Sequence, residues 1–218
     1  MTTVWKVLVP LIVIVVIIAV IFGLVYMTKY NSLVSLQERT NEGRSKFAAA
    51  INTCSQKMKS VWALADQEGI LEKETYTEVA KARSAYDGAE KAYEKARDDK
   101  ATSIMDLTKL GAGLGQALVN VRVAFEAYPQ LRTTETYQKA MAAVQEGFNE
   151  IKTALDDWIT VCKDYNRYRR FLVTDWFASG FRWSFPSQID YYEGGIKSPE
   201  QLKVTTEELN PKSGTEKK

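Results

Sequence analysis

The sequence has 218 residues, with 29 Lys and Arg against 27 Asp and Glu and no His at all. The two signs of charge are interspersed, so the composition predicts no surface for nucleic acid. The lack of His excludes the usual Ser-His and Cys-His catalytic pairs and His-containing metal sites. We therefore expect no catalytic site, no metal site and no cofactor in this chain.

Residues 7–27 form a stretch of 21 uncharged, mostly apolar residues, the only one of its kind in the sequence. As a helix rising ~1.5 Å per residue, this stretch reaches ~31 Å, about the thickness of the hydrocarbon core of a bilayer. A cleaved signal peptide is the alternative, but its apolar region is only ~7–15 residues long and ends at a small-residue cleavage site, which is missing here. We predict a single-pass transmembrane anchor, preceded by the short segment 1–6.

Positive charge is unequal on the two sides of the anchor. Within twenty residues after it come Lys29, Arg39, Arg44 and Lys46. Only Lys6 and the α-amino group precede it. Because cytoplasmic segments carry the excess of Lys and Arg, this asymmetry favours a cytoplasmic position for the rest of the chain. We expect a protein of the cell membrane that contacts the lipid bilayer through residues 7–27.

An apolar stripe follows the anchor at steps of three and four residues, as on one face of a helix. Its positions are Leu33, Leu36, Thr40, Gly43, Phe47, Ala50, Cys54, Met58, Val61 and Ala65. No Pro interrupts the chain after Met27, so we predict that the anchor is continuous with a helix over 28–66. Gly69, in the turn that follows, is available for the end of this helix.

Residues 71–128 show a seven-residue recurrence that predicts one long second helix. The recurring positions are Val79, Tyr86, Tyr93, Lys100, Leu107, Leu114, Val121 and Tyr128. Each has a companion three positions later before Lys100 and four positions later after it, so the stripe shifts around the helix near this residue. Gly111, Gly113 and Gly115 lack the following Lys-Ser/Thr and the preceding strand of a phosphate loop. They indicate a weak point of the helix or close helix packing.

Pro129 ends this segment, because Pro disfavours helical geometry in the residue before it. Thr133 or Thr134 can cap a third helix, which we place over 134–181. Its apolar stripe alternates steps of four and three at Tyr137, Met141, Val144, Phe148, Ile151, Leu155, Trp158, Cys162 and Tyr165. The expected fold is all-α: an N-terminal transmembrane helix continuous with a long antiparallel up-down-up helical bundle over 28–185. A polar C-terminal tail, 186–218, completes the chain.

The lengths of the helices constrain this bundle. At ~1.5 Å per residue, the soluble part of the first helix is ~58 Å long and an unbroken second helix is ~87 Å long. The second helix would therefore overshoot the start of the first by ~29 Å and carry Lys109, Arg122 and Glu126 into the bilayer, where charges are costly. The alternatives are a bend near Gly111, a strongly leaning bundle, or packing at membrane depth inside an assembly of several chains.

Residues 165–192 hold ten of the 24 aromatic residues of the chain, together with four Arg. Three interpretations of this segment are open: a cap on the end of the bundle, a protein contact surface, or a membrane-surface belt. Aromatic residues and Arg are enriched in protein contact surfaces. In an up-down-up bundle the third helix runs away from the bilayer, so we favour contact with another subunit or protein. The candidate contact residues are Tyr165, Tyr168, Arg169, Arg170, Phe171, Trp176, Phe177, Phe181 and Trp183.

Three patches of the sequence carry a family pattern. They are YNSLVSL at 30–36, FEAYPQLR at 125–132, and a closing set made of the Asp-Tyr-Asn of 164–166, Arg170-Phe171 and the Tyr-Tyr-Glu of 191–193. Between residues 25 and 195 these patches resemble the LemA family, bacterial proteins with one N-terminal membrane helix and a long helical bundle. The resemblance implies this fold and topology, and for some relatives a part in shaping or maintaining membrane compartments.

The chain departs from the family pattern in two places. Members usually have an Arg-rich, Pro-containing stretch in the first soluble helix, where this chain has KMKSVWALADQEG. After Arg170, the run Phe171-Leu172-Val173 continues smoothly where members have a break of the Arg-Thr-Phe-Pro type. We therefore identify a divergent member of the LemA family.

These observations favour a non-enzymatic, membrane-anchored protein that self-associates as a homo-oligomer and acts as a scaffold or adaptor for an unidentified protein partner at a bacterial membrane. The alternative is a transmembrane signalling or sensory coiled-coil protein, but the six residues before the anchor leave little to bind an external ligand. A third hypothesis is an enzyme that uses carboxylates such as Asp156, Asp157 and Asp164. Cys54 and Cys162 lie on apolar stripes and are interpreted as core thiols.

Overall fold

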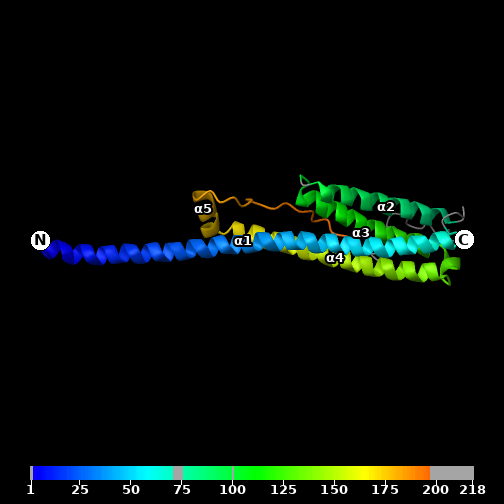
Figure 1. Ribbon diagram of the computed structural model, residues 1–218, viewed down its shortest axis with the longest axis horizontal. Coiled ribbons are helices and arrows are strands. Elements are labelled where there is room, and N and C mark those ends of the chain that lie inside the picture. The colour runs from blue at the N-terminus through cyan, green and yellow to red at the C-terminus, as the bar shows by residue number, and fades with distance from the viewer. Residues whose placement is uncertain (1, 71–75, 100, 197–218) are drawn as a thin grey trace, which may run out of the picture. The chain divides into compact units, whose positions relative to one another are not determined.

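The computed structural model describes residues 2–70, 76–99 and 101–196, and the regular secondary structure among them is helical, with no strand. The elements, in chain order, are α1 (Thr2–Gln67), α2 (Thr77–Asp98), α3 (Ile104–Glu126), the 3-10 turn η2 (Pro129–Leu131), α4 (Glu135–Arg169) and α5 (Leu172–Gly180) (Figure 1). The all-α prediction is confirmed. The contacts divide the chain into two compact units, which we call the anchor unit (the described parts of 1–42 and 161–189) and the bundle unit (those of 43–160 and 190–218).

Helix α1 runs without interruption over 66 residues, which confirms that the apolar stretch is continuous with the first helix of the bundle. Among the described residues, α1 is the one helix long and apolar enough to cross a membrane, with a mean hydropathy of 3.4 in its most apolar part. The side chains of that part, such as Ile17 and Leu24, are exposed on the isolated chain. So continuous an apolar surface requires lipid or another apolar partner.

The segment 71–128, expected as one helix, contains two, because the chain turns between α2 and α3. Asp99 leaves helical geometry (φ −82°, ψ 112°), and its carboxylate accepts a hydrogen bond from the backbone N–H of Ala101 at 2.9 Å. Ser103 then caps α3: its hydroxyl oxygen accepts from the N–H of Asp106 at 3.1 Å. Such local side-chain bonds compete with a continuous helix and favour a turn and a new start. The shift of the stripe near residue 100 was the sequence signal of this turn.

The additional turn changes the topology of the bundle unit. In the contacts between α1 and α4, Gly43 lies opposite Trp158, while Cys54, further along α1, lies opposite Gly147, earlier on α4. These two helices are therefore antiparallel, and the unit has four passes, up-down-up-down, with α2 and α3 as a hairpin (Figure 1). The expected three-pass arrangement had the last helix parallel to the first and is corrected here, since it counted α2 and α3 as one pass.

Close packing of α1, α3 and α4 brings large aromatic side chains against glycines. The ring of Phe47 packs edge-on against Tyr93 at 5.8 Å and tilted against Trp158 at 5.6 Å, measured between ring centroids. A Cβ atom added at Gly111 would overlap the Phe47 ring. Helix α3 is continuous through Gly111, so this glycine serves close packing and the expected alternative of a bend there is not adopted. With 22 and 23 residues, α2 and α3 are ~33 and ~35 Å long, and the expected overshoot disappears.

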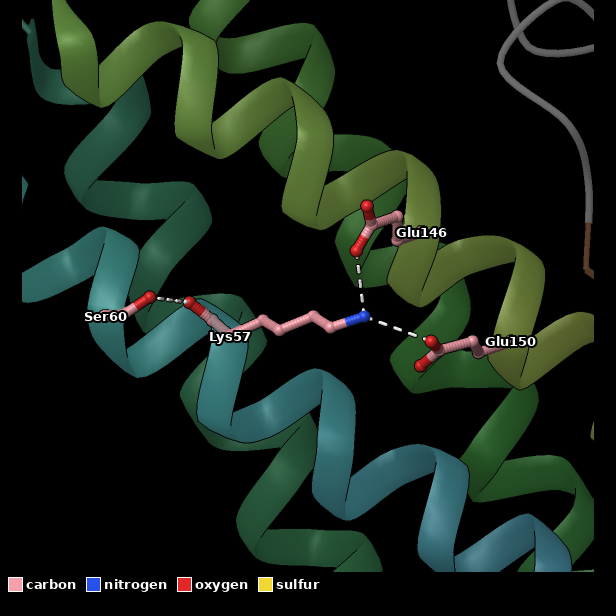
Figure 2. Close-up of polar contacts among 4 residues, drawn as sticks. All are labelled: Lys57, Ser60, Glu146 and Glu150. Carbon is pink, nitrogen blue, oxygen red and sulfur yellow. Dashed lines mark hydrogen bonds and ion pairs between the residues drawn. The ribbon is translucent and has the colours of Figure 1, made fainter.

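An ion-pair cluster sets the register of α1 against α4 in the bundle unit. The Lys57 ammonium donates to Glu146 at 2.9 Å and to Glu150 at 3.0 Å, one helical turn apart on α4, as Figure 2 shows. These two hydrogen bonds raise the pKa of Lys57 above its ordinary value. Both carboxylates are partly exposed, so the cluster selects the register more than it stabilises the fold.

The segment 190–196, expected to belong to a polar tail, packs on α3 instead. The backbone N–H of Tyr192 donates to the Thr108 hydroxyl at 2.9 Å, and the buried Ile196 side chain covers Gly115. The contacts described involve one apolar side chain, Ile196, and one hydroxyl acceptor, Thr108. So few residues give no sequence pattern that distinguishes this stretch from a polar tail. The remainder of the expected tail, 197–218, lies outside the described residues.

Two glycines of α3 differ in their surroundings: Gly111 lies against the Phe47 ring, whereas Gly113 lies in open space. This difference leads to a prediction about stability. Gly111→Ala is expected to lower the free energy of unfolding by about 1–3 kcal/mol, because the new methyl group displaces the Phe47 ring. Gly113→Ala, where nothing lies within 4 Å of the added Cβ, is expected to raise it by about 0.5–1 kcal/mol through the better helix propensity of Ala. Denaturant titration followed by circular dichroism measures both, and equal effects of the two variants would contradict the packing described.

Candidate functional site

Helix α4 ends at Arg169 and α5 begins at Leu172, so the helix expected over 134–181 is interrupted. Phe171 takes an extended conformation between them (φ −60°, ψ 132°). The guanidinium of Arg169 reaches across this turn and donates to the Asp175 carboxylate. The interruption between α4 and α5 is thus accompanied by a local ion pair, Arg169 with Asp175, that bridges the turn. In Figure 1, α5 lies across α1 and not along it.

Within the anchor unit, α5 and the residues after it pack on α1 at the end of the apolar stretch. The ring of Phe177 lies 5.0 Å from that of Phe22, and the ring of Phe181 lies 5.0 Å from that of Tyr26. The indole N–H of Trp183 donates to the Tyr26 hydroxyl at 3.2 Å. We call this set, with its neighbours, the aromatic cluster: Phe22, Tyr26, Tyr30, Trp176, Phe177, Phe181, Trp183 and Phe185.

This placement corrects the reasoning that favoured protein contact over lipid. That reasoning assumed a last helix running away from the bilayer, whereas α4 is antiparallel to α1 and the segment after it folds onto the apolar part of α1. Of the candidate contact residues, Tyr165, Arg169 and Phe177 are buried, whereas Tyr168 and Trp183 are half-buried. The exposed ones are Arg170, Phe171, Trp176 and Phe181. Their role as a protein contact surface stays a prediction.

Sequence reasoning missed the α1 half of the cluster. Phe22, Tyr26 and Tyr30 recur every four residues where the apolar stretch gives way to polar sequence. That spacing puts three aromatic rings on one helix face, which was a usable signal. The neighbouring Lys29 ammonium lies 5.0 Å from the centroid of the Tyr168 ring, a cation–π contact that joins α1 to the end of α4.

Tyr165 and Asn166, the Tyr-Asn pair of the closing sequence pattern, bind the backbone of the segment after α5. The Asn166 side chain exchanges two hydrogen bonds with the backbone of Ile189, each 2.8 Å long. The Tyr165 hydroxyl donates to the carbonyl of Pro186 at 2.7 Å. Together they hold the extended segment that follows α5 against the end of α4, and burial raises the pKa of Tyr165.

An apolar groove of about 580 Å³ opens between α1 and α5. It is lined by Ile18, Ile21, Phe22, Val25, Leu172, Val173, Trp176 and Phe177. No charged or hydrogen-bonding side-chain group other than the Trp176 indole faces it, so it is suited to hydrocarbon and unsuited to a polar substrate.

The titratable groups considered for catalysis or metal binding lie on α1 and α4. No three His, Cys, Asp or Glu side chains come together among the described residues in a way that could hold a metal ion. Asp156 accepts a hydrogen bond from Lys152 at 3.3 Å on the same helix, and Asp157 is exposed. Both cysteines are buried and free, as interpreted from the sequence. Burial raises the pKa of the Cys54 thiol to about 11 and that of Cys162 to about 12.

The raised thiol pKa values lead to a prediction about reactivity. At pH 8 neither Cys54 nor Cys162 should be alkylated by iodoacetamide in the folded protein, because only the thiolate reacts and both groups are protonated and buried. Mass spectrometry should find both thiols modified after unfolding in urea. A thiol introduced by Ala49→Cys, at an exposed position of α1, is the control and should react in the folded state. Rapid alkylation of either native thiol would contradict the burial described.

Comparison with known proteins identifies one family. The LemA family model matches residues 58–201, a range that begins near the end of α1 and contains α2, α3, α4 and α5. No curated protein and no solved structure matches the chain. Family membership and the apolar N-terminal helix together fit a membrane-associated protein. Since the match covers more than half of the sequence and includes the closing Tyr-Asn pattern, the chain belongs to the LemA family.

Proposed function

We propose that this protein is a non-enzymatic scaffold or adaptor at a bacterial membrane, assembled from several copies of the chain. The observation that carries the proposal is the continuity of α1, which contains the apolar stretch and also supplies Phe47, Ile51 and Met58 to the core of the bundle unit. A domain that only needs attachment to a membrane can be held by a flexible linker. Here the membrane helix is itself a structural member of the domain.

The distribution of ionisable groups supports the non-enzymatic part of the proposal. The buried titratable side chains of the bundle unit include Cys54 and Tyr86, whose Sγ and hydroxyl oxygen lie 3.8 Å apart in the packed core. Burial raises the pKa of both groups and keeps them neutral near pH 7. The excess of Lys and Arg after the apolar stretch supports a cytoplasmic position for the bundle.

Self-association is assigned to the face that α1 and α4 share in the bundle unit. A shallow groove of about 480 Å³ runs between them. Its lining consists of Gly43, Lys46, Ala50, Thr53, Asn149, Glu150, Thr153, Ala154 and Asp157. The small side chains allow the backbone of a second helix to approach closely, and the presence of both signs of charge makes the face complementary to a second copy of itself.

The membrane favours such a contact. Copies anchored in one bilayer share a plane and an orientation, so much of the rotational entropy of association is already lost and the effective concentration is high. A weak side-to-side contact between bundles is then sufficient for assembly. An ordered set of anchored copies would impose its own geometry on the membrane, which connects the scaffold to membrane shaping or maintenance.

Assembly is testable on the full-length protein. In mild detergent and in lipid nanodiscs, light scattering is expected to give a mass of several chains that persists on dilution. Ala50→Trp, which fills the groove, should shift the particles to smaller mass with unchanged helix content, because a large side chain blocks the close approach of a second helix. The matched control is Ala49→Trp, at the exposed neighbouring position outside the groove, which should leave the mass unaltered. A monomer at all concentrations would overturn the proposal.

A further inference from the structure

The contacts of helix α5 place it beside the last part of the apolar stretch of α1. Its rings touch Phe22, and the apolar groove that it forms reaches back to Ile18. Phe22 lies five residues, or ~7.5 Å, before Met27, the last residue of the apolar stretch, and Ile18 lies ~13.5 Å before it. If α1 crosses a bilayer, the groove between α1 and α5 lies below the surface of one leaflet.

The outward face of α5 is uncovered and mostly apolar; its one charged side chain, Asp175, is 59% exposed and paired with Arg169. Leu172 is 85% exposed, Trp176 is 58% exposed and Phe171 is 54% exposed, whereas Thr174, Phe177 and Ala178 face inward and are buried. The same side of the groove continues into Ile18 and Ile21 of α1, which are also exposed on the isolated chain. One apolar surface thus extends from the membrane helix across α5.

The polar groups of this region are arranged by depth. Asp175 is the one charged residue in α5, and it is paired with Arg169. The indole N–H of Trp183 donates to the hydroxyl of Tyr26, one residue before the end of the apolar stretch, as Trp and Tyr do at the boundary of lipid and water. Lys29 follows two residues after the apolar stretch, at the level of lipid headgroups.

We propose that α5 is embedded in the bilayer leaflet at the end of the apolar stretch, with Leu172, Val173 and Trp176 in contact with lipid acyl chains. Each chain then holds the membrane through two elements, one that crosses it and one that lies across α1 within a single leaflet. Continuity with the apolar surface of α1 identifies the occupant of the groove as lipid. The proposal does not depend on self-association, because the outward face of α5 shares no residue with the α1–α4 groove.

Immersion of α5 adds volume to one leaflet and none to the other. An interfacial helix that enters one leaflet acts as a wedge, and its binding is sensitive to membrane curvature. The fold therefore supplies a physical route from an anchored bundle to a preference for curved membranes.

Spin labels on the full-length protein in vesicles of phosphatidylcholine and phosphatidylglycerol test the position of α5. Labels are attached to Leu172→Cys and, separately, Trp176→Cys, in a background with Cys54→Ala and Cys162→Ala. Val16→Cys in the apolar stretch is the reference for acyl-chain depth, and Ala49→Cys is the reference for water. Paramagnetic resonance then compares collisions with oxygen, which concentrates in lipid, with collisions with a water-soluble nickel chelate.

At both α5 positions the oxygen-to-nickel collision ratio is expected to be several-fold higher than at Ala49→Cys and close to that at Val16→Cys. A ratio equal to that at Ala49→Cys would place α5 in water and overturn the proposal. Low collision rates with both reagents would show that protein covers the groove, which would equally overturn it in favour of a second copy. Leu172 is almost fully exposed, so its label does not disturb the fold; unchanged helix content verifies this.

Discussion

The turn between α2 and α3 decides where the C-terminal part of the chain goes. Asp99 and Ser103 bind nearby backbone N–H groups at 2.9 and 3.1 Å, and these two hydrogen bonds end one helix and begin the next. With this turn the bundle unit has an even number of passes, so α4 runs antiparallel to α1. Without it α4 would run parallel to α1, and the segment after α4 could not meet the apolar part of α1.

The bundle unit is held by close approach of its helices. Gly111 admits the ring of Phe47, Gly43 admits that of Trp158, and Gly147 lies against Cys54. Because interiors are packed to crystal-like density, such paired positions leave little freedom in how the helices slide past one another. The pairing of Lys57 with two carboxylates on successive turns of α4 selects the same register from the surface. Packing and charge therefore agree on one arrangement.

The anchor unit and the bundle unit differ in the surfaces that they expose. In the anchor unit, apolar and aromatic side chains remain exposed along α1 and α5. The indole N–H of Trp183 donates a hydrogen bond to the Tyr26 hydroxyl. In the bundle unit, the apolar stripe of each helix is buried and the outer face carries small and charged residues. Separate residues for contact with lipid and for contact with protein agree with the scaffold that we propose.

Much of this protein was predictable from the sequence, because its helices bury regular stripes. The apolar stretch, its continuity with the first helix and the all-α class follow from composition and from spacings of three and four residues, which depend only on local geometry. The patches that contain Tyr-Asn and Tyr-Pro predicted membership of the LemA family, and the match of the family model to residues 58–201 confirms it.

Only the tertiary structure decided the number of passes and the destination of the aromatic segment. A seven-residue recurrence continues on both sides of a turn when two helices bury similar stripes, so over 71–128 only the shift of the stripe near residue 100 indicated a turn, and nothing showed that the chain reverses there. The direction of α4 depends on that reversal. So does the contact of Phe177 with Phe22 and of Phe181 with Tyr26, in each case 155 positions apart in sequence. Local periodicity determines which face of a helix is buried, whereas its partner is selected by the three-dimensional path of the chain.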